Sequence, residues 1–277
     1  MQQSRRTKSS ERFSLLLLLV SAVAVATGQS GFSESQVRFE AGVGWTLGIQ
    51  AAEFVSDYQG VLGGTASSFG VPVGGRASVN QYLTENLSVG LSGGFFRASI
   101  RESYVYDPQP PAARLGPRQA VTQNIEVTAA PVYAVVDYYT GSRQFTGYLG
   151  AGVGLLFGNV LWTEEIQPSQ LLGARTSGTR YDASIVAPAL MLRTGVSLGF
   201  DGPKNARSMN GIRVDVSYAI APLRGTYMAS QFDSFAVPPP ERLRESYAID
   251  PGGVRVEIGF FILLRQRPTV TKTNERM

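Results

Sequence analysis

The sequence is dominated by short segments in which apolar and polar residues alternate with a period of two. In the segment 37–49, one face carries Val, Phe, Ala, Trp, Leu and Ile, and the other carries Arg, Glu, Gly and Thr. Because successive side chains of a strand point to opposite faces, this alternation predicts strands with one apolar face. We expect eight strands, at 37–49, 70–83, 87–100, 122–139, 145–160, 183–201, 211–226 and 254–265.

The connections between these segments alternate between long and short. The long ones are rich in Gly, Pro, Ser and Gln and cover 50–69, 101–121, 161–182 and 227–253. The shorter ones are 84–86, 140–144 and 202–210. An even number of strands, with turns at one end and long loops at the other, is typical of a membrane-spanning barrel. We therefore predict an all-β fold, an eight-stranded antiparallel transmembrane β-barrel in an up-and-down meander over residues 37–265.

The polar face of the predicted strands indicates lipid rather than water outside the barrel. That face is mostly Gly, Ser, Ala and Thr, which suits a narrow lumen filled by side chains. Only three of the 25 basic residues are lysines, although a water-facing surface usually carries many. Aromatic residues near the predicted strand ends fit a membrane-interface girdle, namely Tyr82, Tyr138, Tyr139, Phe145 and Phe200.

Four positions fit the predicted strands poorly. Pro131, Pro188 and Pro222 lie inside them, where proline removes a ladder hydrogen bond, so we expect bulges or shifted strand borders there. Asp137 falls on the lipid-facing register, which is tolerable only near the turn that follows it.

The segment 1–26 has the features of a cleavable signal peptide. Residues 1–12 are basic, 15–26 are apolar, and Ala24-Val25-Ala26 is a small-residue cleavage signal, so we expect cleavage after Ala26 or Gly28. Twelve apolar residues are too few to cross a bilayer as a helix. We expect 27–36 to be a short periplasmic lead-in and 266–277 a polar C-terminal tail. Without the leader, 21 basic and 20 acidic residues remain, so the basic pI gives no argument for nucleic acid as a partner.

The composition excludes several kinds of chemistry. The chain has no cysteine and therefore no disulfide scaffold or thiolate metal site, and it has no histidine to act as a catalytic base. We find no convincing pair of acids in the long loops and no calcium or phosphate-binding motif. We expect no catalytic residues, no cofactor, no metal site and no enzymatic activity.

Charged residues gather on the register that we predict to face the lumen. Buried charges persist only when they are paired, so we expect salt bridges that fill the lumen. The alternative is a gate or a narrow ion path. The predicted network consists of Arg38, Glu40, Arg76, Glu126, Arg193, Arg213, Asp215, Arg255 and Glu257.

The predicted long loops are rich in aromatic residues. Exposed aromatics on loops suit recognition of a partner. Alternatively, these residues cap the barrel mouth or extend its strands beyond the bilayer. They are Tyr104, Tyr106, Trp162, Tyr181, Tyr227, Phe232 and Phe235.

The leader, the strand rhythm and the closing strand GGVRVEIGFFILL at 252–264 resemble the small eight-stranded outer-membrane β-barrels of the OmpA/OmpX type. The resemblance covers about residues 35–265, and the polar tail after Arg265 departs from it. It implies the outer membrane of a Gram-negative bacterium, export by the general secretory route, and a monomer. It also implies outer-membrane lipid and the barrel-assembly machinery as partners.

The function expected from this resemblance is a non-enzymatic envelope or surface-interaction role. An extracellular or periplasmic protein partner would then be needed. Two alternatives stay open: a narrow channel or small-ligand carrier, and an accessory barrel of a secretion or assembly system.

Overall fold

The computed structural model describes residues 35–47, 49, 51–55, 68–106, 119–142, 144–167, 177–200, 208–226 and 246–266. The predicted signal peptide with its cleavage site at Ala26, the lead-in up to residue 34 and the tail from residue 267 lie outside these ranges. The strands are β1 (Ser35–Leu47), β2 (Val73–Tyr82), β3 (Leu87–Tyr106), β4 (Gln119–Gly141), β5 (Phe145–Ile166), β6 (Gly178–Phe200), β7 (Ser208–Ile220), β8 (Leu223–Thr226), β9 (Ser246–Ile249) and β10 (Gly253–Gln266).

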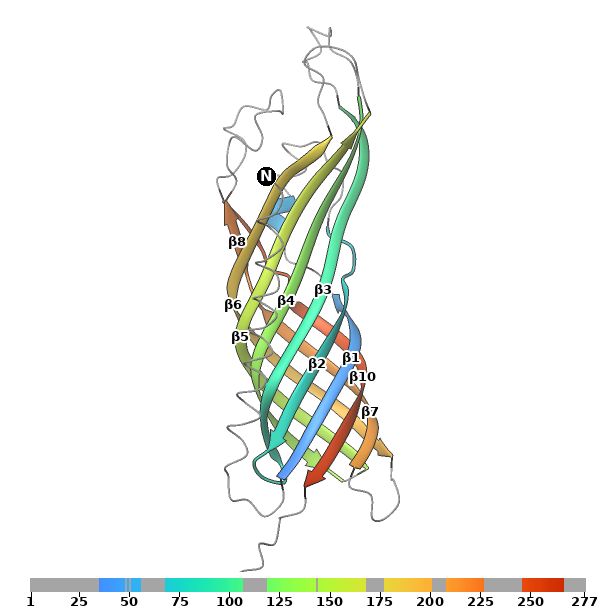
Figure 1. Cartoon of the computed structure of the whole chain (residues 1–277), viewed down its shortest axis with the longest axis vertical. Helices are drawn as coiled ribbons and strands as arrows, with labels where there is room; N and C mark the ends of the chain where they lie inside the picture. The colour runs from blue at the N-terminus through green and yellow to red at the C-terminus, as the bar shows by residue number, and fades with distance from the viewer. Residues whose placement is uncertain are drawn as a thin grey trace, which may run out of the picture.

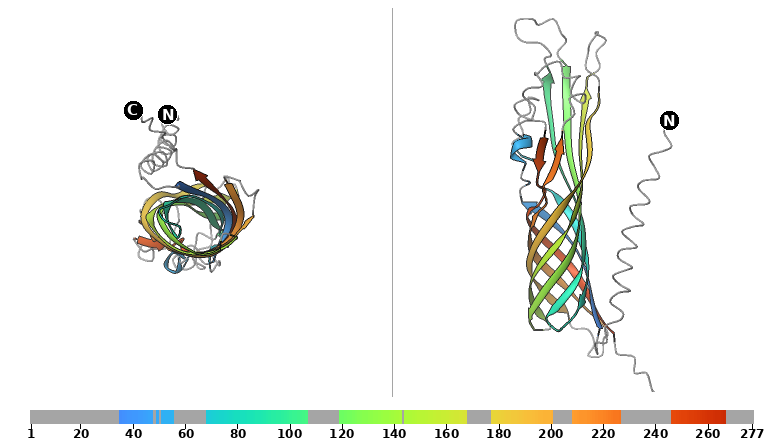
Figure 2. Two further views of the ribbon diagram at one scale, coloured as in Figure 1. Left: turned by 90° about the horizontal axis from the view of Figure 1, so that it is seen from below. Right: turned by 90° about the vertical axis from the view of Figure 1, so that its left-hand side faces the viewer.

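Eight of these strands form a closed antiparallel barrel in the order β1-β10-β7-β6-β5-β4-β3-β2 (Figure 1). Each strand pairs with its neighbour in the meander, and β1 pairs with β10 from Ser35↔Gln266 to Leu47↔Val254 to close the ring. Seen along its axis, the ring is complete (Figure 2, left). The predicted eight-stranded antiparallel barrel is confirmed. Among the described residues, no helix is long and apolar enough to cross a membrane.

The outer face of the barrel carries a continuous apolar band. On β5 the outward residues from Phe145 to Phe157 are almost all large and apolar. The band ends at the same level on neighbouring strands. At this level, Phe157 of β5 pairs with Ala130 of β4 on one side and with Val186 of β6 on the other. At about 3.3 Å per residue and a tilt of about 40°, this stretch of β5 rises roughly 30 Å, which matches a hydrocarbon core. The outer face is therefore that of a transmembrane barrel.

Strands β3–β6 continue well beyond this band and form a tall sheet on one side of the molecule (Figure 2, right). We call this end of the barrel the loop end, and the opposite end, with the short connections 83–86 and 142–144, the turn end. The beginnings of two predicted long loops are therefore strand, since β3 runs to Tyr106 and β5 to Ile166. Beyond the band, the outward residues become polar, as at Arg97, Thr128 and Asn159.

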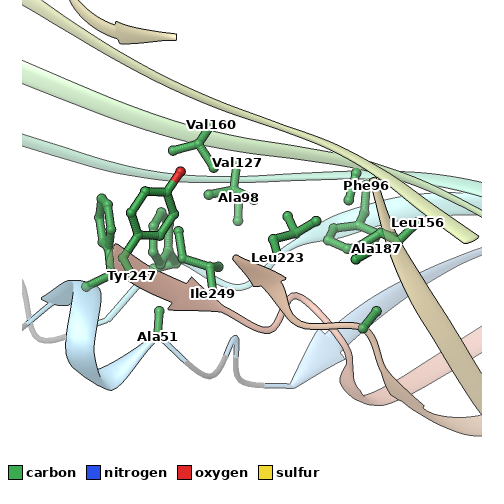
Figure 3. Close-up of a cluster of buried hydrophobic side chains, with 14 of the residues drawn as sticks. Ala51, Phe96, Ala98, Val127, Leu156, Val160, Ala187, Leu223, Tyr247 and Ile249 are labelled. Carbon is green, nitrogen blue, oxygen red and sulfur yellow. The ribbon is translucent and has the colours of Figure 1, made fainter. Parts of the chain in front are cut away.

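A small cap packs against the inner face of the tall sheet. It consists of the β8–β9 hairpin and one helical turn at 52–55. Leu223 and Ile249 of the hairpin are fully buried, and so are Val127 and Val160 of the sheet (Figure 3). Burial of this apolar surface gives the loop end a hydrophobic core of its own.

The three prolines have different structural explanations. Pro131 stays in register with Leu156 of β5, while the ladder to β3 is interrupted opposite it without a shift of register. Pro188 lies beyond the last β6–β7 pair, Leu190↔Ile220. The backbone N–H that proline lacks is therefore not needed for pairing with β7. Pro222 lies between β7 and β8, so the predicted strand 211–226 is wrong and consists of two strands. The register shift in the β5–β6 pair lies at Trp162/Thr163, away from the prolines.

Candidate functional site

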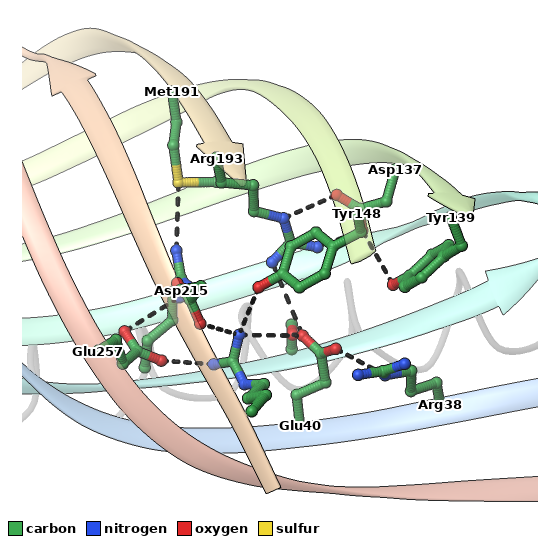
Figure 4. A network of polar contacts seen from close by, with 12 residues as sticks. Arg38, Glu40, Asp137, Tyr139, Tyr148, Met191, Arg193, Asp215 and Glu257 are labelled. Atoms are coloured by element: carbon green, nitrogen blue, oxygen red, sulfur yellow. Dashed lines mark hydrogen bonds and ion pairs between the residues drawn. The ribbon is translucent and has the colours of Figure 1, made fainter. Parts of the chain in front are cut away.

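The inside of the barrel holds a layer of buried charges, part of which is shown in Figure 4. Glu40, Asp215 and Glu257 of this layer all contact Arg213 on β7. Its guanidinium contacts Asp215 at 2.5 Å and Glu40 at 3.4 Å, and it also forms an ion pair with Glu257. One cation therefore joins carboxylates from three neighbouring strands, β7, β10 and β1.

A second ion pair joins β4 to β6 across the intervening strand β5. Arg193 on β6 donates from Nε to Asp137 Oδ1 at 2.7 Å and from Nη2 to Asp137 Oδ2. The Tyr139 hydroxyl lies 3.5 Å from the same carboxylate, and Glu40 lies 3.7 Å from Arg193. Asp137 is completely buried, so the prediction that it faces lipid is wrong.

Two further arginines complete the charged layer toward the loop end. Arg76 on β2 pairs with Asp215 and, at 3.3 Å, with Glu257. Arg255 on β10 lies 3.2 Å from Glu257, its neighbour two residues along the strand.

Toward the turn end, Arg38 is the last charge of the layer, and aromatic and apolar side chains surround it. Arg38 pairs with Glu40 at 2.7 Å, and its guanidinium lies 3.9 Å from the centre of the Phe261 ring. Tyr139 packs between Tyr82 and Tyr148, with ring centres 5.1 and 5.6 Å apart. Met209 and Leu263 pack with Phe261 in the same region. Tyr82 and Tyr139 thus face the lumen, and only the other three predicted girdle residues are exposed: Tyr138, Phe145 and Phe200.

Glycines on neighbouring strands make room for the buried carboxylates. Asp137 lies directly opposite Gly150, Asp215 opposite Gly195, and Glu257 opposite Gly44. A Cβ atom at residue 195 would lie 2.7 Å from the Cβ of Asp215, which is closer than such atoms approach. Three of the four acids in the charged layer therefore use the space that a glycine on a neighbouring strand leaves free.

The structure brings together eight of the nine residues predicted for the network and places Glu126 elsewhere. Glu126 lies on the outer face of β4 beyond the apolar band, where it pairs with Arg97 of β3. The reason is that the apolar residues of β4 lie on opposite faces in the two halves of the strand. Val127 and Ile125 face inward beyond the band, whereas Val132 and Val136 face outward within it.

The aromatic residues predicted to lie in loops are partly in the core of the cap. Trp162 and Tyr181 are buried in strands of the tall sheet, which agrees with the alternative that these residues extend the strands. The Tyr181 hydroxyl lies 2.9 Å from that of Tyr247 and donates to the carbonyl of Thr226. Burial raises the pKa of Tyr181, so its hydroxyl stays protonated at neutral pH. Tyr104 and Tyr106 are strand residues whose side chains are not described, and Tyr227, Phe232 and Phe235 lie outside the described residues.

The chemistry available to this site is that of paired charges. In the described ranges, no group of His, Cys, Asp and Glu could hold a metal ion. Each of the four acids in the charged layer contacts at least one guanidinium group.

Comparisons with known proteins find similar architectures only. No protein family model matches the sequence, and no curated protein matches it. Ail of Yersinia pestis is 9% identical over 83% of this chain and 99% of Ail, with a TM-score of 0.38. OprG of Pseudomonas aeruginosa is 9% identical over 84% and 96% of the two chains, with a TM-score of 0.37. Neisserial surface protein A is 10% identical over 84% and 97%, with a TM-score of 0.34.

Identities this low cannot show a shared function, and TM-scores below 0.5 are too low to support the fold of this chain. The eight-stranded ring is established by the strand pairing itself.

Proposed function

We propose that this chain is a non-enzymatic barrel of the Gram-negative outer membrane, exported by the general secretory route, which presents a rigid sheet to partners outside the cell. The observation that carries the proposal is the division of the molecule at the edge of the apolar band. Below that line the barrel interior holds mutually paired charges, and above it a folded unit with its own core projects from the bilayer.

The closed lumen is the first part of the proposal. The charged layer links β1, β2, β4, β6, β7 and β10, so an ion path would require several buried ion pairs to separate together. Breaking one buried pair costs about 3–5 kcal/mol. A network of such pairs supports a barrel that does not conduct, in preference to a narrow channel.

The barrel should therefore form no stable open channel in planar lipid bilayers. A porin of known conductance, inserted under the same conditions, is the control for membrane formation and sensitivity. Stable nanosiemens-scale conductance of the purified full-length mature chain would contradict the closed lumen and favour the channel alternative.

The projecting sheet is the second part of the proposal. A loop end that only connected strands would need no core, yet Ile125, Trp162 and Tyr247 are buried there. Rigid presentation reduces the entropy lost when a partner binds. This supports surface interaction in preference to a role that depends on periplasmic partners.

Single cysteines should establish the orientation, because the natural chain has none. Thr179 is exposed on β6 at the loop end, and Glu85 is exposed in the β2–β3 turn. In intact cells, a membrane-impermeant maleimide should label the Thr179→Cys variant. The Glu85→Cys variant should react only after the outer membrane is permeabilised. The reverse result would contradict the proposed orientation.

The same two positions distinguish a surface role from an accessory role. A photo-crosslinking side chain at residue 179 should capture a partner outside the membrane, whereas residue 85 should yield only transient contacts during assembly. A defined complex captured from residue 85 alone would instead favour the accessory barrel of a secretion or assembly system.

A further inference from the structure

A small cavity lies inside the barrel between the charged layer and the core of the cap. All eight barrel strands contribute to its wall, and Ala221 and Gly252 lie at the end nearest the cap. It offers about 40 Å³ to the centres of water-sized molecules. One water needs about 10–15 Å³ of such space, so the cavity holds a few waters or one small ion.

Two arginines that line this cavity have donor groups without good acceptors. Nη2 of Arg255 is buried and has no hydrogen-bond partner. Nη1 of Arg76 faces the sulfur of Met191 at 3.5 Å, and Met191 also lines the cavity (Figure 4). A thioether is a weak acceptor, and a buried charged donor without a partner is costly. Each of the two arginines that line the cavity therefore has one guanidinium nitrogen without a good acceptor.

Among the fully buried charges of the barrel, arginines outnumber carboxylates by one, and the half-buried Asp250 nearby carries a further negative charge. The buried layer of the described barrel contains five arginines and four carboxylates: Arg38, Arg76, Arg193, Arg213 and Arg255 against Glu40, Asp137, Asp215 and Glu257. Arg76 and Arg255 share the carboxylate of Glu257. The nearby half-buried Asp250 directs Oδ1 to the backbone amides of Ala221 and Gly252, at 3.0 and 2.9 Å.

We propose that this cavity binds one small monovalent anion of the chloride class between Arg76 and Arg255. An anion supplies the acceptor that the Arg76 and Arg255 guanidinium groups lack at this cavity. The hydroxyl groups of Thr46 and Ser217 also line the cavity and provide further donors. The volume excludes phosphorylated or sulfated organic molecules. This inference is independent of the proposed surface role.

Bromide provides a direct test on the wild-type barrel. In crystals soaked in bromide, the anomalous signal should show one peak within hydrogen-bond distance of Arg255 and Arg76. In solution, chloride should raise the unfolding midpoint by roughly 2–4 °C relative to methanesulfonate at equal ionic strength, because the larger anion does not fit. The shift should grow with the logarithm of chloride concentration.

Variants show whether the effect arises at this cavity. Arg255→Met should abolish the difference between chloride and methanesulfonate, and the milder double variant Thr46→Val/Ser217→Ala should reduce it. Arg97→Met, which removes an arginine outside the lumen, should leave the difference unchanged. Absence of a bromide peak in the wild-type crystals would mean that the cavity holds only water and would overturn the proposal. A peak without any effect of chloride on unfolding would mark an adventitious ion and would also overturn it.

Discussion

Replacing Arg213 with methionine should lower the free energy of unfolding of the barrel by about 3–5 kcal/mol, the cost of breaking a buried ion pair by removing one partner. Methionine nearly fills the volume of the arginine stem, so the loss reports mainly on the missing charge. Arg213 is the cation that contacts Glu40, Asp215 and Glu257 together. Its removal leaves three buried carboxylates to share the remaining arginines, at longer range and with fewer hydrogen bonds.

The two tryptophans offer a way to measure this loss. Trp45 lies on the outer apolar band and Trp162 in the core of the cap, so their fluorescence reports on both parts during unfolding by urea in lipid vesicles. The matched control is Arg97→Met, which breaks the exposed pair with Glu126 and should cost less than about 1 kcal/mol. Equal losses in the two variants would show that the charged layer contributes no more than a surface pair.

The sequence was sufficient to predict the strands whose pattern is uniform along their length. On β1, β5, β7 and β10 the outward residues within the band are apolar, as the alternation predicts. These strands also contain Arg38, Glu40, Arg213, Asp215, Arg255 and Glu257, whose inward direction follows from the same alternation. The alternation of the sequence alone therefore places most of the charged layer on one face of the strands.

The pattern failed on β4 because its two halves lie in different surroundings. Within the band, lipid is outside, and apolar residues such as Val132 and Val136 face outward. Beyond it, water is outside and the cap is inside, so Ile125 and Val127 face inward. The two halves have opposite apolar faces without any change of register. A single rule for the whole strand therefore placed Glu126 inside and Asp137 outside, and both placements were wrong.

The extent of the tall sheet was also hidden in the sequence. Segments such as 101–106 and 161–166 contain charged and hydroxyl residues that resemble loop composition. In the segment 161–166, Trp162 packs in the core that the tall sheet shares with the cap, whose hairpin comes from a distant part of the chain. The buried acids share one feature that the strand register shows. Each of Asp137, Asp215 and Glu257 faces a glycine on the neighbouring strand, and these pairs cannot be recognised until the register is known.

The pair Arg193–Asp137 offers a test in which two damaging changes should cancel. Arg193→Met leaves Asp137 buried with only the distant hydroxyl of Tyr139, so a loss of about 3–5 kcal/mol is expected. Asp137→Val leaves Arg193 with Glu40 at 3.7 Å and should also be strongly destabilising. The double variant should be close to wild type, because an apolar pair of similar volume carries no desolvation penalty.

The coupling free energy from this double-mutant cycle, measured by urea unfolding in vesicles, should be at least about 2 kcal/mol. The size of this coupling distinguishes the two possible directions of the Asp137 side chain. An aspartate that faced lipid would be stabilised by replacement with valine, and the change would not depend on Arg193. Asp137→Val alone would then raise the free energy of unfolding, and the coupling would vanish. A large coupling requires instead that β4 turns this acid into the lumen, although its neighbours Val136 and Tyr138 face the membrane.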